Sequence, residues 1–229
     1  MLQHQRTKSS YYSPPSSILS VQNLGRKIGT YWIWHSLNFT LFPGEKVAVL
    51  GASGSGKSLL LRALAGLDSV EAGEIIFQGK ALNYWYLPHW RSQIIYLHQH
   101  PALWEGTVEE NLKRVYRFKA NQDLVYKRSL ILNYLHLLGK DDDFLQRPVS
   151  AISGGERQIV AFLRALQLAP KILLLDEPTA SLDATTARSL EALVMAWQAE
   201  DCQRAYLWTS HDPSQLQRIT QRQITLQGN

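Results

Sequence analysis

A glycine-rich segment flanked by two apolar runs constrains this chain more than any other feature. Residues 51–58 read GASGSGKS; they follow the apolar run Val47–Leu50 and lead into the leucine-rich stretch SLLLRALAG. This order fits the pattern G-x-x-x-x-G-K-[ST], in which a strand ends in a phosphate-binding loop and a helix begins. The glycines let successive N–H groups point at phosphate oxygens, and the helix N-terminus adds partial positive charge. Because many protein families share the pattern, it predicts an α/β fold with a phosphate site and leaves the family open.

A second segment carries the acids that chemistry on a phosphate requires. ILLLDE, residues 172–177, is an aliphatic run that ends in two carboxylates. Apolar residues on both faces are typical of a central strand covered by helices, and ligands bind at the carboxyl ends of such strands. We expect Lys57 to reach the β and γ phosphates, and Ser58 and Asp176 to hold Mg²⁺. Glu177 would then polarise the attacking water as a general base.

Composition limits the class of protein. The 229 residues are 45% hydrophobic, which fits one large domain with a sizeable core. A formal net charge of +5 suits an anionic partner but does not choose among nucleotide, lipid and nucleic acid. The single Cys202 excludes a disulfide framework and agrees with a reducing compartment. No apolar run approaches the roughly 18 residues of a membrane helix, so any path across a membrane would belong to another chain.

The order of predicted elements alternates strands with helices. Strands are expected over 18–24, 37–41, 46–50, 73–79, 93–99, 171–176, 205–210 and 223–226. Helices are expected after residue 57, within 107–168, over 183–200 and after Asp212-Pro213. This rhythm predicts a mainly parallel sheet with a helical lobe inserted between its halves. We expect a mobile polar tail over 1–17 and one domain over 18–229, with a core of 18–100 and 169–229 and a lobe of 101–168.

The segment ISGGERQ, residues 152–158, narrows the family. It resembles the LSGGQ signature of ABC ATPases, with Ile in place of Leu and Glu in place of Gln. Ser153 and Glu156 have the spacing of a capping box, so a helix start would offer a hydroxyl, two glycine amides and its dipole to an anion. The resemblance implies a P-loop NTPase fold of the ABC ATPase type: a RecA-like core, an antiparallel β subdomain and an inserted α-helical subdomain.

Three further positions follow in the order that this family has. Gln99 matches the Q-loop glutamine, which touches Mg²⁺ and water in the family. SLD, residues 181–183, matches the D-loop that runs along the dimer seam, and His211 matches the switch histidine that contacts the γ-phosphate. The resemblance covers about residues 18–226.

The resemblance implies an ATP-binding and hydrolysing subunit of an ABC transporter. Two copies would pack head to tail, each signature capping the γ-phosphate held by the other, and would drive a separate multi-pass permease from the cytoplasmic face of the membrane, without nucleic acid. The residues implied in catalysis are Lys57, Gln99, Glu177 and His211; those implied in holding Mg²⁺ are Ser58, Gln99 and Asp176. Those implied in binding ATP are Gly51, Ala52, Ser53, Gly54, Ser55, Gly56, Lys57, Ser58, Leu59, Ser153, Gly154, Gly155, Glu156 and Asp183.

Flanking segments point to one branch of the family, and one position departs from the pattern of the whole family. HPALWEGTVEENL, residues 100–112, and the ending LWTSHD…ITLQ are similar to the FetA type, a bacterial group associated with iron export. The aromatic residue that stacks on adenine in relatives should fall near position 28, where this chain has Ile28. Tyr31 or Trp32 could replace it from the same turn. Trp104 is the candidate for the groove that receives the permease.

Two other functions compete with the transporter motor. A soluble ABC ATPase of the iron–sulfur assembly type would keep every one of these motifs, and an adjacent gene for a multi-pass membrane protein would discriminate between the two. A binding module without turnover is disfavoured because Lys57, Asp176, Glu177 and His211 are all present.

Overall fold

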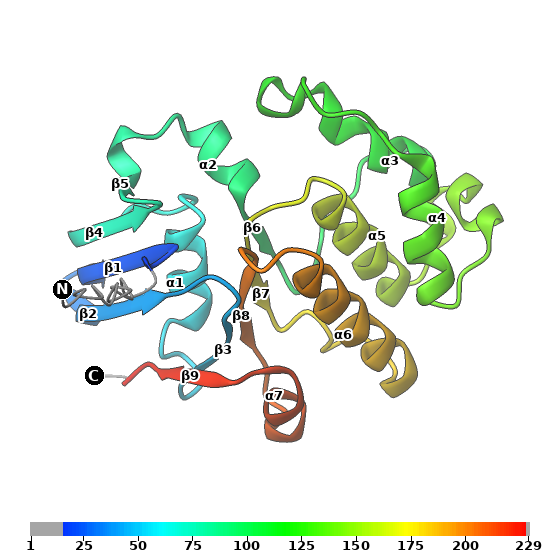
Figure 1. Ribbon diagram of the computed structural model, residues 1–229. Coiled ribbons are helices and arrows are strands. Elements are labelled where there is room, and N and C mark those ends of the chain that lie inside the picture. Colours follow the sequence, from blue (N-terminus) through cyan, green and yellow to red (C-terminus); the bar gives the residue numbers. More distant parts are fainter. Residues whose placement is uncertain (1–15, 228–229) are drawn as a thin grey trace, which may run out of the picture.

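Two sheets organise the molecule, and a computed structural model describes residues 16–227 (Figure 1). The antiparallel sheet has the order β2-β1-β4-β5, and its strands are β1 Leu19–Ile28, β2 Tyr31–Leu41, β4 Ala72–Phe77 and β5 Lys80–Ala81. The second sheet has the order β6-β7-β8-β3-β9, with β3 Lys46–Leu50, β6 Ile94–Leu97, β7 Ile172–Asp176, β8 Ala205–Thr209 and β9 Arg222–Thr225. All neighbouring strands of this second sheet run parallel, as predicted.

The helices lie on both sides of the parallel sheet. The α-helices are α1 Lys57–Leu64, α2 Leu87–Gln93, α3 Val108–Arg114, α4 Arg128–Leu137, α5 Gly154–Leu166, α6 Ala184–Ala199 and α7 Pro213–Ile219. Short 3₁₀ turns are η1 Leu82–Tyr84, η2 Val115–Arg117, η3 Lys119–Asn121, η4 Asp142–Gln146 and η5 Val149–Ala151. None of the helices in the described range 16–227 is long and apolar enough to cross a membrane.

Burial explains why β7 and β8 are almost wholly apolar. Every residue of both strands is buried, and alternate residues enter different cores. Ile172 and Leu174 pack with α1 and the antiparallel sheet, whereas Leu173 and Leu175 pack with α5 and α6. A strand covered on both faces has no solvent side and therefore needs no polar alternation.

Helices α3, α4 and α5 gather at the side of the molecule opposite the antiparallel sheet (Figure 1, green to yellow). Both predicted capping boxes are present: Thr107 with Glu110 at the start of α3, and Ser153 with Glu156 at the start of α5. The larger apolar core runs without a break from these helices to the parallel sheet. The helices expected between residues 107 and 168 are therefore confirmed.

Several predicted boundaries differ from the structure. The strand expected over 37–41 begins at Tyr31, because Tyr31, Trp32 and Trp34 pair with the end of β1 across a tight turn. Their aromatic run lacks the alternation that marks a strand in sequence. The strand expected to end at Gln99 stops at Leu97, so Gln99 lies in the following loop. Strand β5 and helix α2 were not predicted, and residues 1–15 of the expected tail lie outside the described residues.

Candidate active site

The loop of residues 51–58 is shaped by close backbone approach at its glycines. A Cβ at Gly51 would lie 2.4 Å from the Ser55 hydroxyl, and a Cβ at Gly56 would lie 2.5 Å from Ile33. Gly56 also has φ +86°, a conformation that residues with a side chain rarely adopt. The Ser55 hydroxyl is buried and has no hydrogen-bond partner within the described part of the chain. A tight cradle with an orphaned buried donor fits a phosphate group.

Lys57 brings positive charge into the same loop. Its Nζ donates to the carbonyl oxygens of Gly51 at 2.8 Å and Ala52 at 3.1 Å, which holds the ammonium over the loop. Ser58 is exposed in the first turn of α1, a turn that contains no acidic residue. The helix dipole and the ammonium therefore act on the loop without a competing carboxylate in that turn.

The end of β7 holds Asp176 between two neighbouring strands. The carboxylate is 6% exposed; it accepts from the Tyr96 hydroxyl at 2.8 Å and from the Thr209 hydroxyl at 3.0 Å. Burial raises the pKa of Tyr96, and the hydrogen bond to Asp176 raises it further, so the phenol keeps its proton and acts as donor. Two donors fix the orientation of the carboxylate that is predicted to hold Mg²⁺. The carboxylate of Asp176 and the hydroxyl of Ser58, the two side chains predicted to hold the ion, are both oxygen donors, which suit Mg²⁺.

Glu177 has a strained backbone and a direct partner. Its φ is +47°, in the left-handed region, which costs about 1–3 kcal/mol for such a residue. Its N–H donates to the Thr209 hydroxyl at 2.9 Å, and its Oε1 lies 2.8 Å from Nε2 of His211. The structure thus brings together the predicted general base and the predicted switch histidine, which are far apart in the chain. His211 is 68% exposed, so this pair faces solvent.

A buried polar network holds the loop after Glu177 against α7. Gln215 donates to Thr179 at 2.9 Å and to Glu191 of α6 at 2.7 Å. Arg218 of α7 contacts both oxygens of Glu191, at 3.0 and 3.1 Å. Because Glu191 is buried, its charge needs this partner. The network fixes the start of α7, next to His211, relative to the loop that leads to Asp183.

The signature segment forms a separate cavity. Ser153, Gly154, Gly155 and Glu156 line a space of about 430 Å³ together with Ser181, Leu182 and Asp183, while none of residues 51–58 lines it. Asp183 caps α6: its carboxylate accepts from the N–H groups of Thr185 and Thr186 at 3.0 and 2.9 Å. The signature and D-loop motifs therefore lie together, apart from the phosphate loop of the same chain.

The two candidates to replace the missing aromatic residue differ in surroundings. Trp32 packs against Gly25, whose Cβ would lie 2.7 Å from its ring, and Lys27 lies 4.4 Å from the ring centroid. Tyr31 is 79% exposed at the hairpin tip, paired in register with Ile28. Of the two rings, Tyr31 is the one with its surface available to a base.

Three residues of this region were missed at the sequence level. Tyr96 and Thr209 stand at the carboxyl ends of β6 and β8, the two neighbours of β7, so knowledge of the strand order would have found them. Lys140 lines the signature cavity and contacts Glu156, and no sequence pattern pointed to it.

A glycine loop that opens α1, next to a buried strand ending in two acids, defines a P-loop NTPase. The ABC transporter family model matches residues 34–180, and the chain belongs to that family. It is therefore an ABC transporter ATP-binding subunit, and its reaction is ATP hydrolysis.

Two similar proteins match more of the chain than the family model does. The chain is 32% identical to the "Probable iron export ATP-binding protein FetA" of Escherichia coli (strain K12), over 93% of this chain and 92% of that protein. It is also 32% identical to a "Sulfate/thiosulfate import ATP-binding protein CysA" of Halalkalibacterium halodurans, over 90% of this chain but only 58% of CysA.

Solved structures agree with the fold. The ATP-binding cassette MJ0796, seen as a dimer after hydrolysis with ADP and phosphate bound, has a TM-score of 0.78 at 26% identity, covering 91% of this chain and 94% of that chain. CbiO1 of Clostridium perfringens, part of the transporter complex cbiONQ, has a TM-score of 0.71 at 26% identity, covering 86% of this chain and 79% of that chain.

Proposed function

We propose that two copies of this chain bind and hydrolyse ATP at composite sites and drive a membrane permease that exports iron or another metal. The observation that carries the composite site is the separation of the two anion-binding elements: the phosphate loop and the signature line different places in one chain. The MJ0796 relative forms a dimer, which supports the same arrangement here.

We propose roles for the residues around the phosphate loop from the sequence motifs and, where the structure gives them, from contacts. Lys57 and the loop amides would bind the β and γ phosphates, and Ser58, Asp176 and Gln99 would hold Mg²⁺. When bound, this ion neutralises charge that builds up on the transferring phosphoryl group. Glu177 accepts a proton from the attacking water, and His211, 2.8 Å from Glu177, fixes the direction of that carboxylate.

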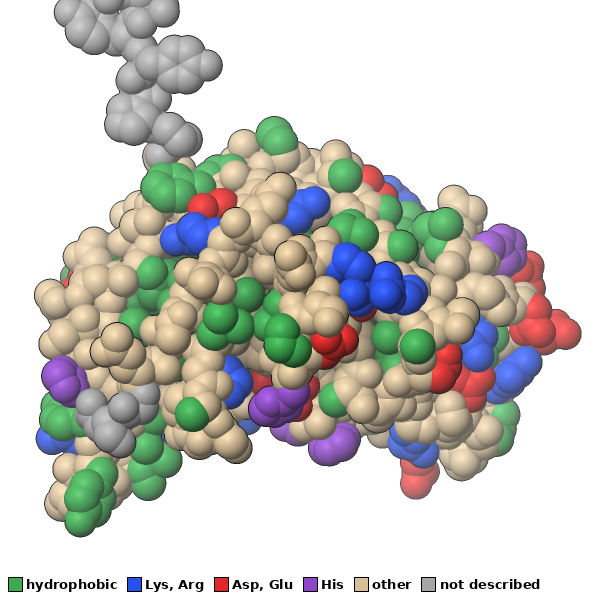
Figure 2. Space-filling model, turned by 90° about the horizontal axis from the view of Figure 1, so that it is seen from below, with side chains coloured by type: hydrophobic (Ala, Val, Ile, Leu, Met, Phe, Trp, Pro, Cys, Tyr) green, Lys and Arg blue, Asp and Glu red, His purple; other side chains and the backbone are tan. Residues whose placement is uncertain are grey.

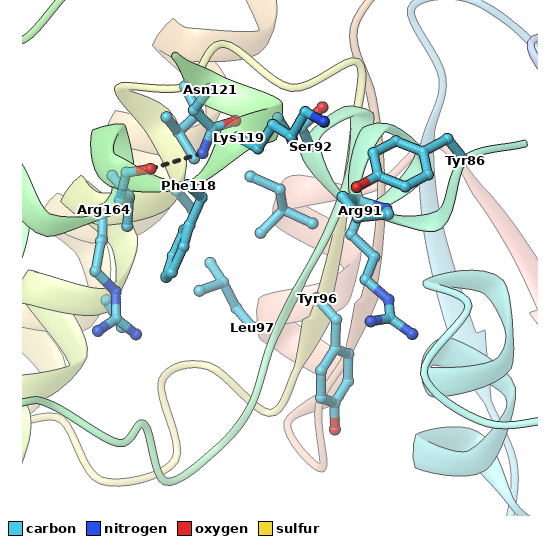
Figure 3. A pocket seen from close by; sticks show the side chains of 16 residues that line it. Tyr86, Arg91, Ser92, Tyr96, Leu97, Phe118, Lys119, Asn121 and Arg164 are labelled. Atoms are coloured by element: carbon cyan, nitrogen blue, oxygen red, sulfur yellow. Dashed lines mark hydrogen bonds between the residues drawn. The ribbon is translucent and has the colours of Figure 1, made fainter. Parts of the chain in front are cut away.

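A groove between α2 and the helical lobe is the proposed permease contact (Figure 3). It has a volume of about 540 Å³, and aromatic side chains at its rim, Tyr86 and Phe118, are 55% and 50% exposed. Arg91, Lys119 and Arg164 also line it, and none of the described lining residues is acidic. This composition suits an apolar segment that carries a carboxylate.

Trp104, the residue predicted for such a groove, does not line it. The guanidinium groups of Arg114 and Arg164 lie over its ring, 4.8 and 4.9 Å from the ring centroid. Trp104 therefore contacts the groove through Arg164, which is a lining residue.

Charged side chains of both signs are mixed on another face of the molecule. The face that carries β9 and α7 shows basic, acidic and histidine side chains interspersed (Figure 2). From its membership of the ABC transporter family we further propose that the chain lies on the cytoplasmic side of a membrane, held there by its permease. The proposed domain has a core of residues 18–100 and 169–229 and a lobe of 101–168.

The cargo proposal rests on similarity to FetA along nearly the whole of both chains. Relatives named for sulfate import match less than two thirds of their own length. Cells that lack this chain should retain more iron or related metal and be more sensitive to metal excess and to peroxide. The wild-type gene should restore resistance and the Glu177→Gln gene should not. Equal metal content and equal resistance in deleted and parental cells would contradict metal export and leave the ATPase assignment intact.

A further inference from the structure

The signature helix of this chain begins with a carboxylate where an anion is expected to bind. Glu156 occupies the third position of α5, and its side chain is 17% exposed. It lines the 430 Å³ signature cavity with Ser153, Gly154 and Gly155. A carboxylate beside a phosphate in a partly buried place is unfavourable, because the two negative charges repel at short range. Glutamine, which the signature usually has here, would carry no such charge.

Two cations from outside the signature contact this carboxylate. Nζ of Lys140 lies 2.8 Å from Oε1 of Glu156, and an Nη of Arg147 lies 3.8 Å from the same oxygen. The other oxygen, Oε2, accepts from the Ser153 N–H at 2.9 Å. Lys140 is the closer of the two cations, and it is itself a lining residue of the cavity.

The position of Lys140 is fixed by its surroundings. Its side chain is 26% exposed, against 45% for Arg147, and its Nζ lies 5.5 Å from the centroid of the Phe144 ring. A cation above an aromatic face is attracted to it. Arg147 lies over the same ring, 5.6 Å from its centroid, so the ring does not distinguish the two cations. They differ in their ion pairs: Lys140 contacts Glu156 at 2.8 Å, whereas Arg147 lies 3.8 Å from Glu156 and also contacts Asp141.

We propose that Lys140 is a positioning residue of the signature half-site: it pairs with Glu156 and offsets its charge, so that the start of α5 can receive the terminal phosphate of ATP held by a second copy. This inference rests on the proposed composite site. The hydrogen bond from Lys140 also holds the pKa of Glu156 below its usual range, so this carboxyl stays ionised at neutral pH.

The test uses the full chain with Glu177→Gln, in which ATP-bound dimers should accumulate. The measurement is the ATP concentration that gives half-maximal dimer by light scattering after gel filtration, in the presence of Mg²⁺. Lys140→Ala should raise this concentration about tenfold, the size expected for one uncompensated charge close to an anion near a protein surface. Lys140→Arg should keep it within about twofold, because a guanidinium also offsets the charge.

The same measurement is then made in chains that also carry Glu156→Gln. In that background Lys140→Ala should change the half-maximal concentration less than about twofold, because no carboxylate is left to offset. Lys113→Ala is the matched control: it removes the ion pair with Glu109 in the same lobe, 3.3 Å long and outside the signature cavity.

Each possible result either supports the role of Lys140 or overturns it. An equal loss in both backgrounds would show that Lys140 acts by packing, and no loss in either would show that it has no role; both overturn the inference. If the Glu177→Gln parent itself stays monomeric with ATP, the composite site fails and the inference fails with it.

Discussion

The two anion-binding elements of this chain are built in opposite ways. The phosphate loop is shaped by contacts within its own chain: Gly56 lies against β2, and Lys57 donates to carbonyls of the same loop. The signature is an open helix start whose contacts are a capping box and the Lys140 ion pair. A loop that wraps a phosphate can act alone, whereas an exposed helix start contributes only to a ligand brought from elsewhere. This difference is what the proposed composite site requires: one complete nucleotide cradle and half of a second site in each chain.

Glu177→Gln should have the largest effect, because it removes the general base and leaves the phosphate loop untouched. Loss of general base catalysis typically costs about 10²–10⁴ in rate. Steady-state ATPase activity should fall by that order while ATP affinity measured by calorimetry is retained. Glu74→Gln, at an exposed position on β4, is the control. Loss of ATP binding in Glu177→Gln would mean that Glu177 belongs to the cradle and not to the reaction step.

Lys57→Ala should weaken ATP binding by the phosphate loop. It removes a charged donor from the cradle, a contact worth about 1.5–3 kcal/mol, so ATP affinity should fall about tenfold or more. Calorimetry with ATP and Mg²⁺ measures this, with the exposed Lys80→Ala as the control. Unchanged affinity would contradict the assignment of residues 51–58 as the phosphate site.

Ile28→Tyr should strengthen the contact between the chain and the adenine base of ATP. Aromatic stacking on a base is worth about 1–3 kcal/mol, so the added ring should tighten ATP binding roughly tenfold. Tyr31→Ala should weaken binding of the wild-type chain, because Tyr31 is the more exposed of the two neighbouring rings. Trp32→Ala should instead disturb the hairpin, since Trp32 packs on Gly25. Circular dichroism separates these two effects, and a Tyr31→Ala variant with unchanged affinity would exclude that ring.

Asp68→Asn should have the smallest effect. Arg62 of α1 holds Asp68 by two hydrogen bonds of 2.7 Å, and these, with the charges of Arg62 and Arg26, lower the pKa of Asp68. A lowered pKa means that the ion pair stabilises the fold above the usual Asp range and that this contribution disappears as pH falls through the lowered value. Because Arg62 is 40% exposed, the loss at pH 7 should be about 1 kcal/mol or less. Thermal melts at pH 7 and below pH ~4 test it: the difference from wild type should shrink in acid, and a constant difference would exclude the ion pair as its cause.

Features encoded over a few residues were predictable from the sequence, and features built by tertiary contacts were not. The phosphate loop, both capping boxes and the acids that end β7 are each contained in short segments. The contact of Tyr96 with Asp176 joins residues 80 apart, and it depends on β6 lying beside β7. The left-handed backbone of Glu177 likewise depends on Thr209 from the other neighbouring strand. Lys140 reaches Glu156 across a turn whose course no local pattern reveals.

We propose that ATP completes its site only between two copies of this chain. The direct measurement is the molar mass of the Glu177→Gln chain by light scattering after gel filtration, with ATP and Mg²⁺ and again with ADP. We expect a shift from the 26.0 kDa of one chain to twice that mass with ATP, and a monomer with ADP. A chain that binds ATP and stays at the mass of a monomer would contradict the composite site.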